Sequence, residues 1–189
     1  MRAVCIDGHF VPDQTNQLQG IIGGDVVSRD AWLAETVVFI KIGTNICTGV
    51  LIDQDVVLTA AHCVLENGVA ASVQSIEVSF SPQVECDQRN GSITSLVSRA
   101  ERVIAKDEYL QSRRVYSSDR RNSQETHQIM AHDLAMIKLA RPAPENFRPT
   151  VLSSSYIDPS RTPYLIAGHG ITTGAGTPDN GDPLVLRAT

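Results

Sequence analysis

The sequence predicts an all-β protein, either a barrel or a sandwich. Short runs of β-branched and apolar residues recur along the chain, and turn residues such as Gly43-Thr44-Asn45 separate them. The run Ser75–Phe80 also alternates with a period of two, which is typical of a half-buried strand. Short β-rich runs divided by turn residues favour a barrel or sandwich over a helical fold. With 189 residues, the chain is long enough to bury a sizeable core.

The predicted strands share an apolar, β-branched composition. They are Thr36–Ile42, Ile46–Ile52, Val56–Thr59, Ser75–Phe80, Ser92–Val97 and Arg102–Ala105. The short polar segment Asp53-Gln54-Asp55 joins two of them as a turn. Asn90-Gly91 is a strong hairpin-turn signal, and we prefer this interpretation to a glycosylation sequon, because so short a pattern often arises by chance.

Composition limits the class of protein. The net charge of −5 argues against a nucleic-acid partner, which would favour a basic surface. No apolar run approaches the roughly 18 residues of a membrane span, so no membrane partner is expected. The four cysteines suit an oxidising compartment and allow three full pairings, among which spacing alone does not choose. Zinc ligation would need a Cys-x-x-Cys pair or a second histidine at ligand spacing, so we expect no metal and no cofactor.

The first residues do not read as a secretory signal. Met1-Arg2 could be a charged n-region, but Cys5-Ile6-Asp7-Gly8-His9 interrupts any apolar h-region. A secreted-type domain without such a signal would have a start that is truncated, misassigned or already processed. The alternative is a cytosolic protein with reduced thiols.

The segment Val56–Cys63 is the most informative part of the chain. An apolar strand runs into Ala60 and Ala61, and then into His62 and Cys63. The two small residues leave room around the imidazole, and a general base must be held within hydrogen-bond reach of its proton. The alternative is a satisfied histidine without a chemical role.

This segment resembles the trypsin-like serine protease family, whose catalytic histidine lies in such a Thr-Ala-Ala-His-Cys sequence. Three more segments match the family in the same order, over about residues 21–189. They are Ile21-Ile22-Gly23-Gly24, His132-Asp133-Leu134-Ala135-Met136-Ile137-Lys138-Leu139 and Tyr164-Leu165-Ile166-Ala167-Gly168-His169-Gly170. The resemblance implies a chymotrypsin-like double antiparallel β-barrel, with the first barrel complete and the second truncated.

The same resemblance implies the organisation of the chain. Residues 1–20 would be a propeptide or linker without a core of its own, and residues 21–140 the first barrel. The proline-rich residues 141–150 would link the barrels, and residues 151–189 would begin an incomplete second barrel. Between the histidine and aspartate motifs, the polar residues 111–128 read as an inserted surface loop.

The family chemistry assigns a role to several residues. His62 would be the base, and Asp133 would orient it, although Asp133 could instead cap a strand. Cys47 and Cys63 would form a disulfide, while Cys5 and Cys86 could pair with each other, stay free or bond elsewhere. Ile21 would become the new N-terminus after an activating protease cleaves behind Gly20, unless Ile21 simply starts the first strand. Gly20 is not the arginine or lysine of a trypsin-activated zymogen.

The family's nucleophile segment, Gly-Asp-Ser-Gly-Gly, does not occur in these residues. From the resemblance we expect a secreted serine endopeptidase, extracellular or periplasmic, that acts on polypeptides. Because the nucleophile segment is missing, we expect these residues to be a fragment that is inactive by itself. The alternative is a non-catalytic homologue that serves as a binding or regulatory module. His169 replaces the family's more usual tryptophan at a position that packs, and we predict His127 and His169 to be surface residues. We assign no role to His132.

Overall fold

The computed structural model describes residues 3–12, 24–66, 69–94, 96–105, 109, 132–155, 157–158, 161–169 and 186–189. Its strands are β1 (Ala3–Ile6), β2 (His9–Pro12), β3 (Asp25–Val26), β4 (Val37–Ile42), β5 (Asn45–Asp53), β6 (Val56–Thr59), β7 (Leu65–Glu66), β8 (Val69–Ala70), β9 (Ile76–Ser79), β10 (Val97–Ala105), β11 (Ala135–Leu139), β12 (Ala167–His169) and β13 (Leu186–Ala188). The short helices are η1 (Trp32–Glu35), α1 (Ala61–Val64) and η2 (Val73–Ser75).

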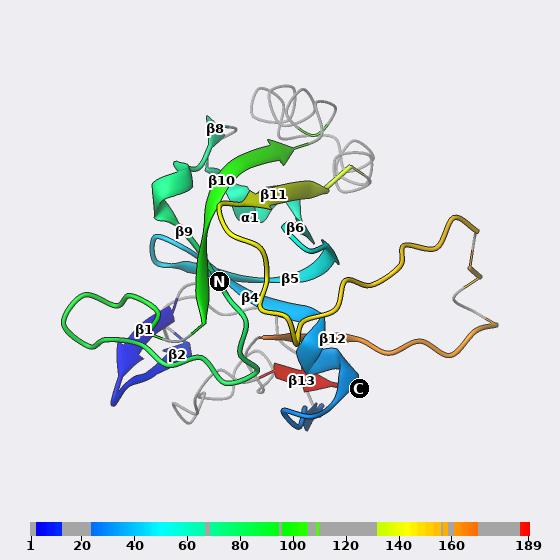
Figure 1. The fold of residues 1–189 in the computed structure, drawn as a ribbon, viewed down its shortest axis with the longest axis horizontal. Coiled ribbons are helices and arrows are strands. Elements are labelled where there is room, and N and C mark those ends of the chain that lie inside the picture. Colours follow the sequence, from blue (N-terminus) through cyan, green and yellow to red (C-terminus); the bar gives the residue numbers. More distant parts are fainter. Residues whose placement is uncertain are drawn as a thin grey trace, which may run out of the picture.

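Six strands close into an antiparallel barrel in the order β10-β11-β6-β5-β4-β9 (Figure 1). Closure leaves these strands without the open edges that invite aggregation. The interior is filled by apolar side chains, and the larger fully buried ones are Ile40, Leu51, Val57, Ile76, Val78, Ile137 and Leu139. The predicted all-β barrel is confirmed.

Strand β4 is buried on both of its faces, which explains its nearly continuous apolar sequence. Val38 and Ile40 point into the barrel, where they join the main core. On the outer face, Phe39 packs in a second cluster and Val37 in a third. β4 therefore contributes to all three apolar clusters, and Figure 1 shows it between the β1–β2 pair and the β12–β13 pair.

An ion triad around a buried carboxylate ties β4, β9 and β10 together. The Glu77 carboxylate on β9 is only 4% exposed, and it lies 3.0 Å from the Lys41 ammonium and 3.0 Å from the Arg99 guanidinium. Lys41 and Arg99 stand directly opposite Glu77 on the two neighbouring strands. The two cations compensate the cost of burying this charge, because a buried carboxylate without a partner is strongly unfavourable.

Within residues 1–20, which the sequence predicts to lack a core of their own, residues 3–12 share a core with the barrel. β1 and β2 form an antiparallel hairpin whose two-residue turn is Asp7-Gly8. Both turn residues have positive φ, 50° and 81°, as a type I′ turn requires. Phe10 is 1% exposed and stacks on Phe39, with ring centroids 5.5 Å apart. The hairpin has no core of its own, but it shares one with the barrel.

The strand predictions for Ser92–Val97 and Arg102–Ala105 are partly wrong. Residues 92–94 and 96 are not in a strand, because Ile93 makes only an isolated bridge to Cys86 and Leu96 has a φ of 39°. Instead a single strand, β10, runs from Val97 to Ala105. The predicted strands near β4, β5, β6 and β9 are confirmed within one residue or two, and Asn90-Gly91 forms the predicted turn, with Gly91 at a φ of 64°.

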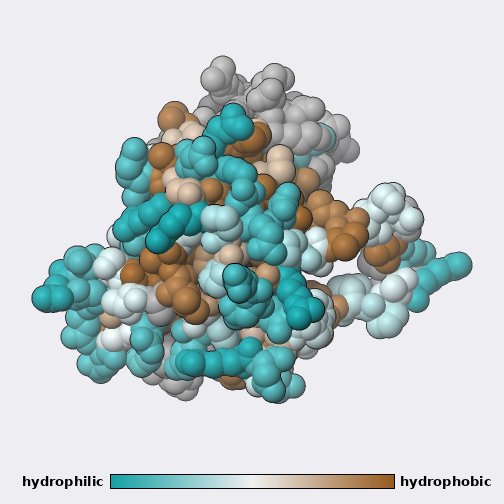
Figure 2. Space-filling model, in the orientation of Figure 1, coloured by the Kyte–Doolittle hydropathy of each residue, from teal (hydrophilic) through white to brown (hydrophobic). Residues whose placement is uncertain are grey.

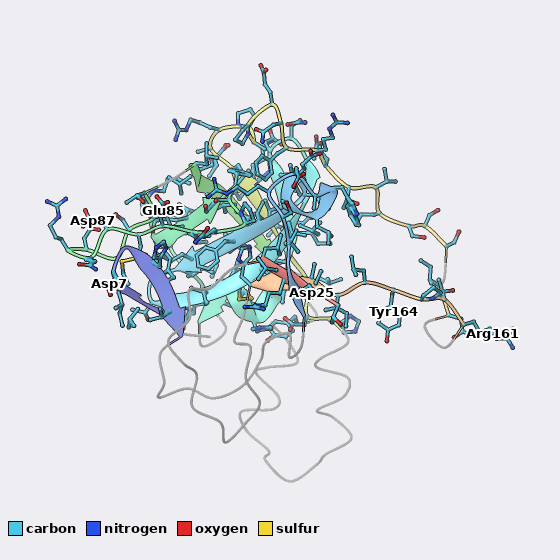
Figure 3. All side chains as sticks on the ribbon, turned by 90° about the horizontal axis from the view of Figure 1, so that it is seen from below. Asp7, Asp25, Glu85, Asp87, Arg161 and Tyr164 are labelled. Atoms are coloured by element: carbon cyan, nitrogen blue, oxygen red, sulfur yellow. A yellow bond between two sulfur atoms is a disulfide. The ribbon has the colours of Figure 1, made fainter. Side chains whose placement is uncertain are left out.

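Of the remaining described strands, three form a smaller sheet in the order β12-β13-β3, and β7 pairs with β8 in a two-stranded sheet. The described residues 151–155, 157–158 and 161–166 project away from the barrel, as the labelled Arg161 and Tyr164 show in Figure 3. Figure 2 shows brown apolar atoms on this projecting arm. Its exposed apolar side chains are Val151, Leu152, Ile157, Tyr164, Leu165 and Ile166. Among the described residues, no helix is long and apolar enough to cross a membrane.

Candidate functional site

The pairing of β6 with β11 brings His62 and Asp133 together. Thr59, the last residue of β6, lies opposite Ala135, the first residue of β11. Because the strands are antiparallel, the chain just after β6 meets the chain just before β11 at one end of the barrel. His62 is in the short helix α1 that follows β6, and Asp133 lies two residues before the start of β11. The site is thus made by strand register between segments far apart in the sequence.

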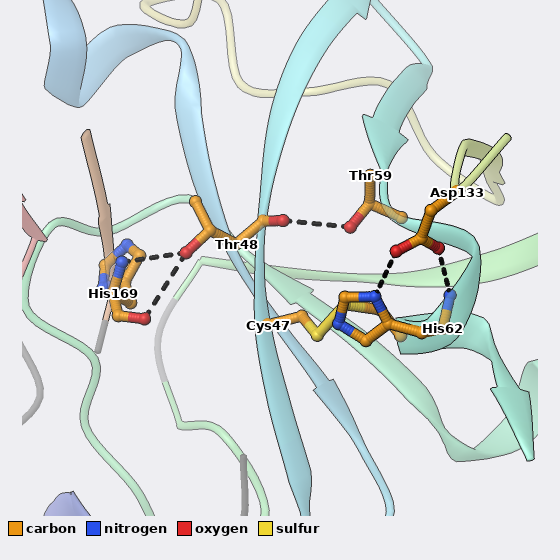
Figure 4. Close-up of a disulfide and its surroundings, with 7 residues drawn as sticks. Cys47, Thr48, Thr59, His62, Asp133 and His169 are labelled. Carbon is orange, nitrogen blue, oxygen red and sulfur yellow. Dashed lines mark hydrogen bonds and ion pairs between the residues drawn. A yellow bond between two sulfur atoms is a disulfide. The ribbon is translucent and has the colours of Figure 1, made fainter. Parts of the chain in front are cut away.

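Asp133 holds His62 at two points (Figure 4). One carboxylate oxygen, Oδ2, lies 2.6 Å from Nδ1 of the imidazole. The other, Oδ1, accepts a hydrogen bond of 2.8 Å from the backbone N–H of His62. The imidazole side chain is 48% exposed and the carboxylate side chain 21%. The two contacts fix both the position and the rotation of the carboxylate relative to the ring.

The backbone around His62 is held by covalent and polar contacts. Cys63, the next residue, is bonded to Cys47 on β5. The Thr59 hydroxyl donates to the Thr48 carbonyl over 2.9 Å and joins the end of β6 to β5 (Figure 4). Ala61, next to His62, is fully buried in the main core. Sequence reasoning did not single out Thr48 and Thr59, since threonines carry no signal until their strands are paired.

The sulfur atoms of Cys47 and Cys63 and a ring nitrogen of His62 lie within 4.8 Å of one another. This spacing alone would be compatible with a metal ion. However, both sulfurs are committed to the disulfide, and zinc binds the free thiolate. In this oxidised state the group cannot supply the ligands that a zinc site needs.

His169 on β12 is buried, so its predicted surface position is wrong. Its ring meets Phe39 edge to face, with centroids 5.2 Å apart, and it is 7% exposed. Its backbone N–H donates to the Thr48 hydroxyl over 2.8 Å. Neither ring nitrogen has a hydrogen-bond partner among the described residues. Burial disfavours the charged ring and lowers the pKa of His169 from 6.5 to about 3.

Several predicted residues lie outside the described part of the chain. These are the activation site Gly20–Ile21, the loop residues 111–128 and His127. Cys5 and Cys86, whose pairing the sequence left open, are bonded to each other.

The geometry at His62 suits proton transfer. An ionised carboxylate only accepts hydrogen bonds, so Nδ1 of His62 must donate to Asp133. The neutral ring then carries its lone pair on Nε2, which can accept a proton from a reacting group. Asp133 would also stabilise the positive ring that forms after the transfer.

Comparison with known proteins gives the family. The sequence model of the trypsin family matches residues 21–188. This chain belongs to the trypsin family. A solved structure of a scabies mite inactivated protease paralogue, S-D1, is similar in fold, with a TM-score of 0.62 and 18% sequence identity. The match covers 89% of this chain and 60% of that one, so this chain spans less than two thirds of its length. No curated protein was found to match.

Proposed function

We propose that this chain carries the base and the orienting acid of a serine endopeptidase. His62 is the general base, Asp133 fixes its tautomer, and the substrate is a polypeptide. The observation that carries the proposal is the double contact of Asp133 with the Nδ1 and the backbone N–H of His62, at 2.6 Å and 2.8 Å. Family membership supports the reaction class, which is acyl transfer from a peptide bond.

Hydrolysis needs more than these two side chains. A serine nucleophile must attack the carbonyl, and backbone donors must bind the oxyanion; loss of one such donor costs about 10²–10³ in rate. The 189 residues contain no Gly-Asp-Ser-Gly-Gly segment, and the nearest sequence, Gly181-Asp182-Pro183, has proline in the place of serine. We therefore propose that residues 1–189 by themselves do not cleave peptides.

Activation by cleavage between Gly20 and Ile21 is also part of the proposal. In the family, the freed ammonium pairs with an aspartate beside the nucleophile and so stabilises the active packing. Gly20 does not suit a protease that requires arginine or lysine. The two disulfides support an extracellular or periplasmic location.

The alternative is a non-catalytic homologue that serves as a binding or regulatory module. The scabies mite neighbour is described as an inactivated protease paralogue, which keeps this alternative open. The intact pair of His62 and Asp133 favours the enzyme, because a homologue without catalysis has no chemical reason to keep both.

The test uses the protein purified from its native source with its disulfides intact. Its mass is compared with the 20.5 kDa of the chain, and it is treated with a fluorescent serine-directed phosphonate and with casein. An enzyme takes up the label and turns over casein, and a recombinant His62→Ala form of the same protein does neither. If a folded native protein of greater mass is neither labelled nor active, the binding-module alternative replaces the enzyme.

A further inference from the structure

We propose that the hairpin of residues 3–12 is a permanent clamp on the barrel, and that it stays bound when the chain is cut between Pro12 and Gly24. The hairpin would also hold β12 in place through the aromatic contacts of Phe10 with Phe39 and of Phe39 with His169. The proposal concerns how this chain is held together, and it stands whether or not the protein is a protease.

The first support is covalent. Cys5 on β1 is bonded to Cys86, which lies in the loop between β9 and β10. Hydrolysis of a peptide bond between Pro12 and Gly24 adds one water, breaks one C–N bond and leaves a carboxylate and an amine. It does not touch the S–S bond, so the product would be two chains joined by Cys5–Cys86.

The second support is the backbone contact between the hairpin and the barrel. The amide of Ala3 donates to the Thr44 carbonyl over 3.1 Å, and the amide of Cys86 donates to the Gly8 carbonyl over 2.8 Å. His9 and Glu85 form an isolated antiparallel bridge. Figure 3 shows the hairpin turn at Asp7 beside Glu85 and Asp87. These contacts dock both ends of the hairpin, in addition to its disulfide.

The third support is the shared apolar cluster. Phe10 of the hairpin is 1% exposed, and apart from Ala3 of the same hairpin the residues buried with it come from the barrel and the 84–93 loop. They include Phe39, Ile46, Val84 and Ile93. Without the hairpin, the outer face of Phe39 and its neighbours would face water. A removable leader would have no reason to bury its largest apolar side chain in the core it leaves behind.

Aromatic contacts extend this clamp to β12. Phe39 is fully buried, stacks on Phe10 with ring centroids 5.5 Å apart, and meets His169 edge to face at 5.2 Å. His169 is in β12, so the hairpin and the smaller sheet pack against the same β4 side chain. Loss of Phe10 would hydrate Phe39 and loosen the contact that holds β12 on the barrel.

The covalent claim is tested with a chain in which residues 15–18 are replaced by the recognition sequence of a site-specific protease. After complete cleavage, we expect one species without reductant, heavier than the uncut chain by one water molecule. Reduction under denaturing conditions should release the N-terminal peptide. Loss of this peptide without reductant, or disulfide mapping that pairs Cys5 elsewhere, would overturn the proposal.

The clamp function is tested with Phe10→Ala, and Val4→Ala serves as the matched control, since Val4 is on the same hairpin and 43% exposed. Hydrogen exchange of residues 37–42 and 167–169 should accelerate by about tenfold or more in Phe10→Ala and by less than about twofold in Val4→Ala. If Phe10→Ala does not fold, Phe10→Leu is measured instead, because leucine keeps most of the side-chain volume. Its hydrogen exchange should accelerate by an intermediate amount. Equal exchange in the Phe10 and Val4 variants would refute the clamp.

Discussion

The carboxylate of Asp133 contacts His62 twice, once at the ring and once at the backbone. Each oxygen has a separate partner, so the carboxylate cannot rotate without losing a hydrogen bond. In this way one side chain from the segment just before β11 sets both the place of α1 and the orientation of the imidazole.

This double contact makes the effect of Asp133→Asn predictable. The amide oxygen must face the His62 N–H, so its NH₂ group faces Nδ1 and forces the ring proton onto Nε2. Nitrogen NMR of His62 should therefore show a switch of tautomer. In a form that carries a nucleophile, kcat should fall by about 10⁴, the cost of the wrong tautomer in such triads. Asp158→Asn, which affects an exposed pair with Arg161, should leave the His62 tautomer unchanged.

Removal of each disulfide should destabilise the chain by a different amount. Cys47–Cys63 closes a loop of 16 residues and Cys5–Cys86 one of 81. Loop-closure entropy predicts losses of about 3 and about 4.5 kcal/mol for the paired Cys→Ala variants, measured by urea unfolding. Only loss of Cys47–Cys63 should broaden the His62 resonances, because Cys63 is its neighbour. Equal broadening in both variants would contradict the role of this disulfide in holding His62.

Gly49 on β5 should not accept a side chain. A methyl group there would lie 2.5 Å from a Val57 side-chain carbon and 3.2 Å from the backbone oxygen of Leu58. Gly49→Ala should therefore cost about 1–3 kcal/mol of unfolding free energy by overpacking. Thr44→Ala, at an exposed turn, is the control and should change it by less than about 0.5 kcal/mol. An unfolding midpoint for Gly49→Ala at or above that of the natural chain would show that the strand can shift.

His169 should make the protein less stable in acid. The pKa of its ring is 6.5 when the side chain is exposed to water and about 3 in the folded chain, so between these values the unfolded chain binds the extra proton. Stability therefore falls as the pH drops below about 6.5, by up to several kcal/mol, and this penalty is absent above that pH. His169→Phe removes the titration and keeps a ring against Phe39. Urea unfolding from pH 7 to pH 4 should show a smaller loss in this variant; parallel curves would exclude His169 as the cause.

The barrel strands are predictable from the sequence because the apolar runs and turn residues that mark them are contiguous. Val37–Ile42 is apolar at almost every position, and Asp53-Gln54-Asp55 breaks the chain between two such runs. The bounds of β10 are harder to predict from the sequence, since exposed Arg99, Glu101 and Arg102 give this strand a polar composition. The hairpin of residues 3–12 carries a signal too, Asp7-Gly8 between apolar residues. Because the same residues interrupt the apolar region of a signal peptide, the hairpin is not predicted from them.

The sequence by itself determined the all-β class, most strand positions and the family, because β-branched runs, turn residues and the segment around His62 are properties of contiguous residues. Only the tertiary structure decided that β6 pairs with β11 and so joins His62 to Asp133, that Cys5 bonds Cys86, and that His169 is buried against Phe39. These contacts connect residues far apart in the chain, and their energies depend on strand register and burial. Sequence spacing alone does not choose among the three full cysteine pairings, and the closed barrel with its docked hairpin selects one of them.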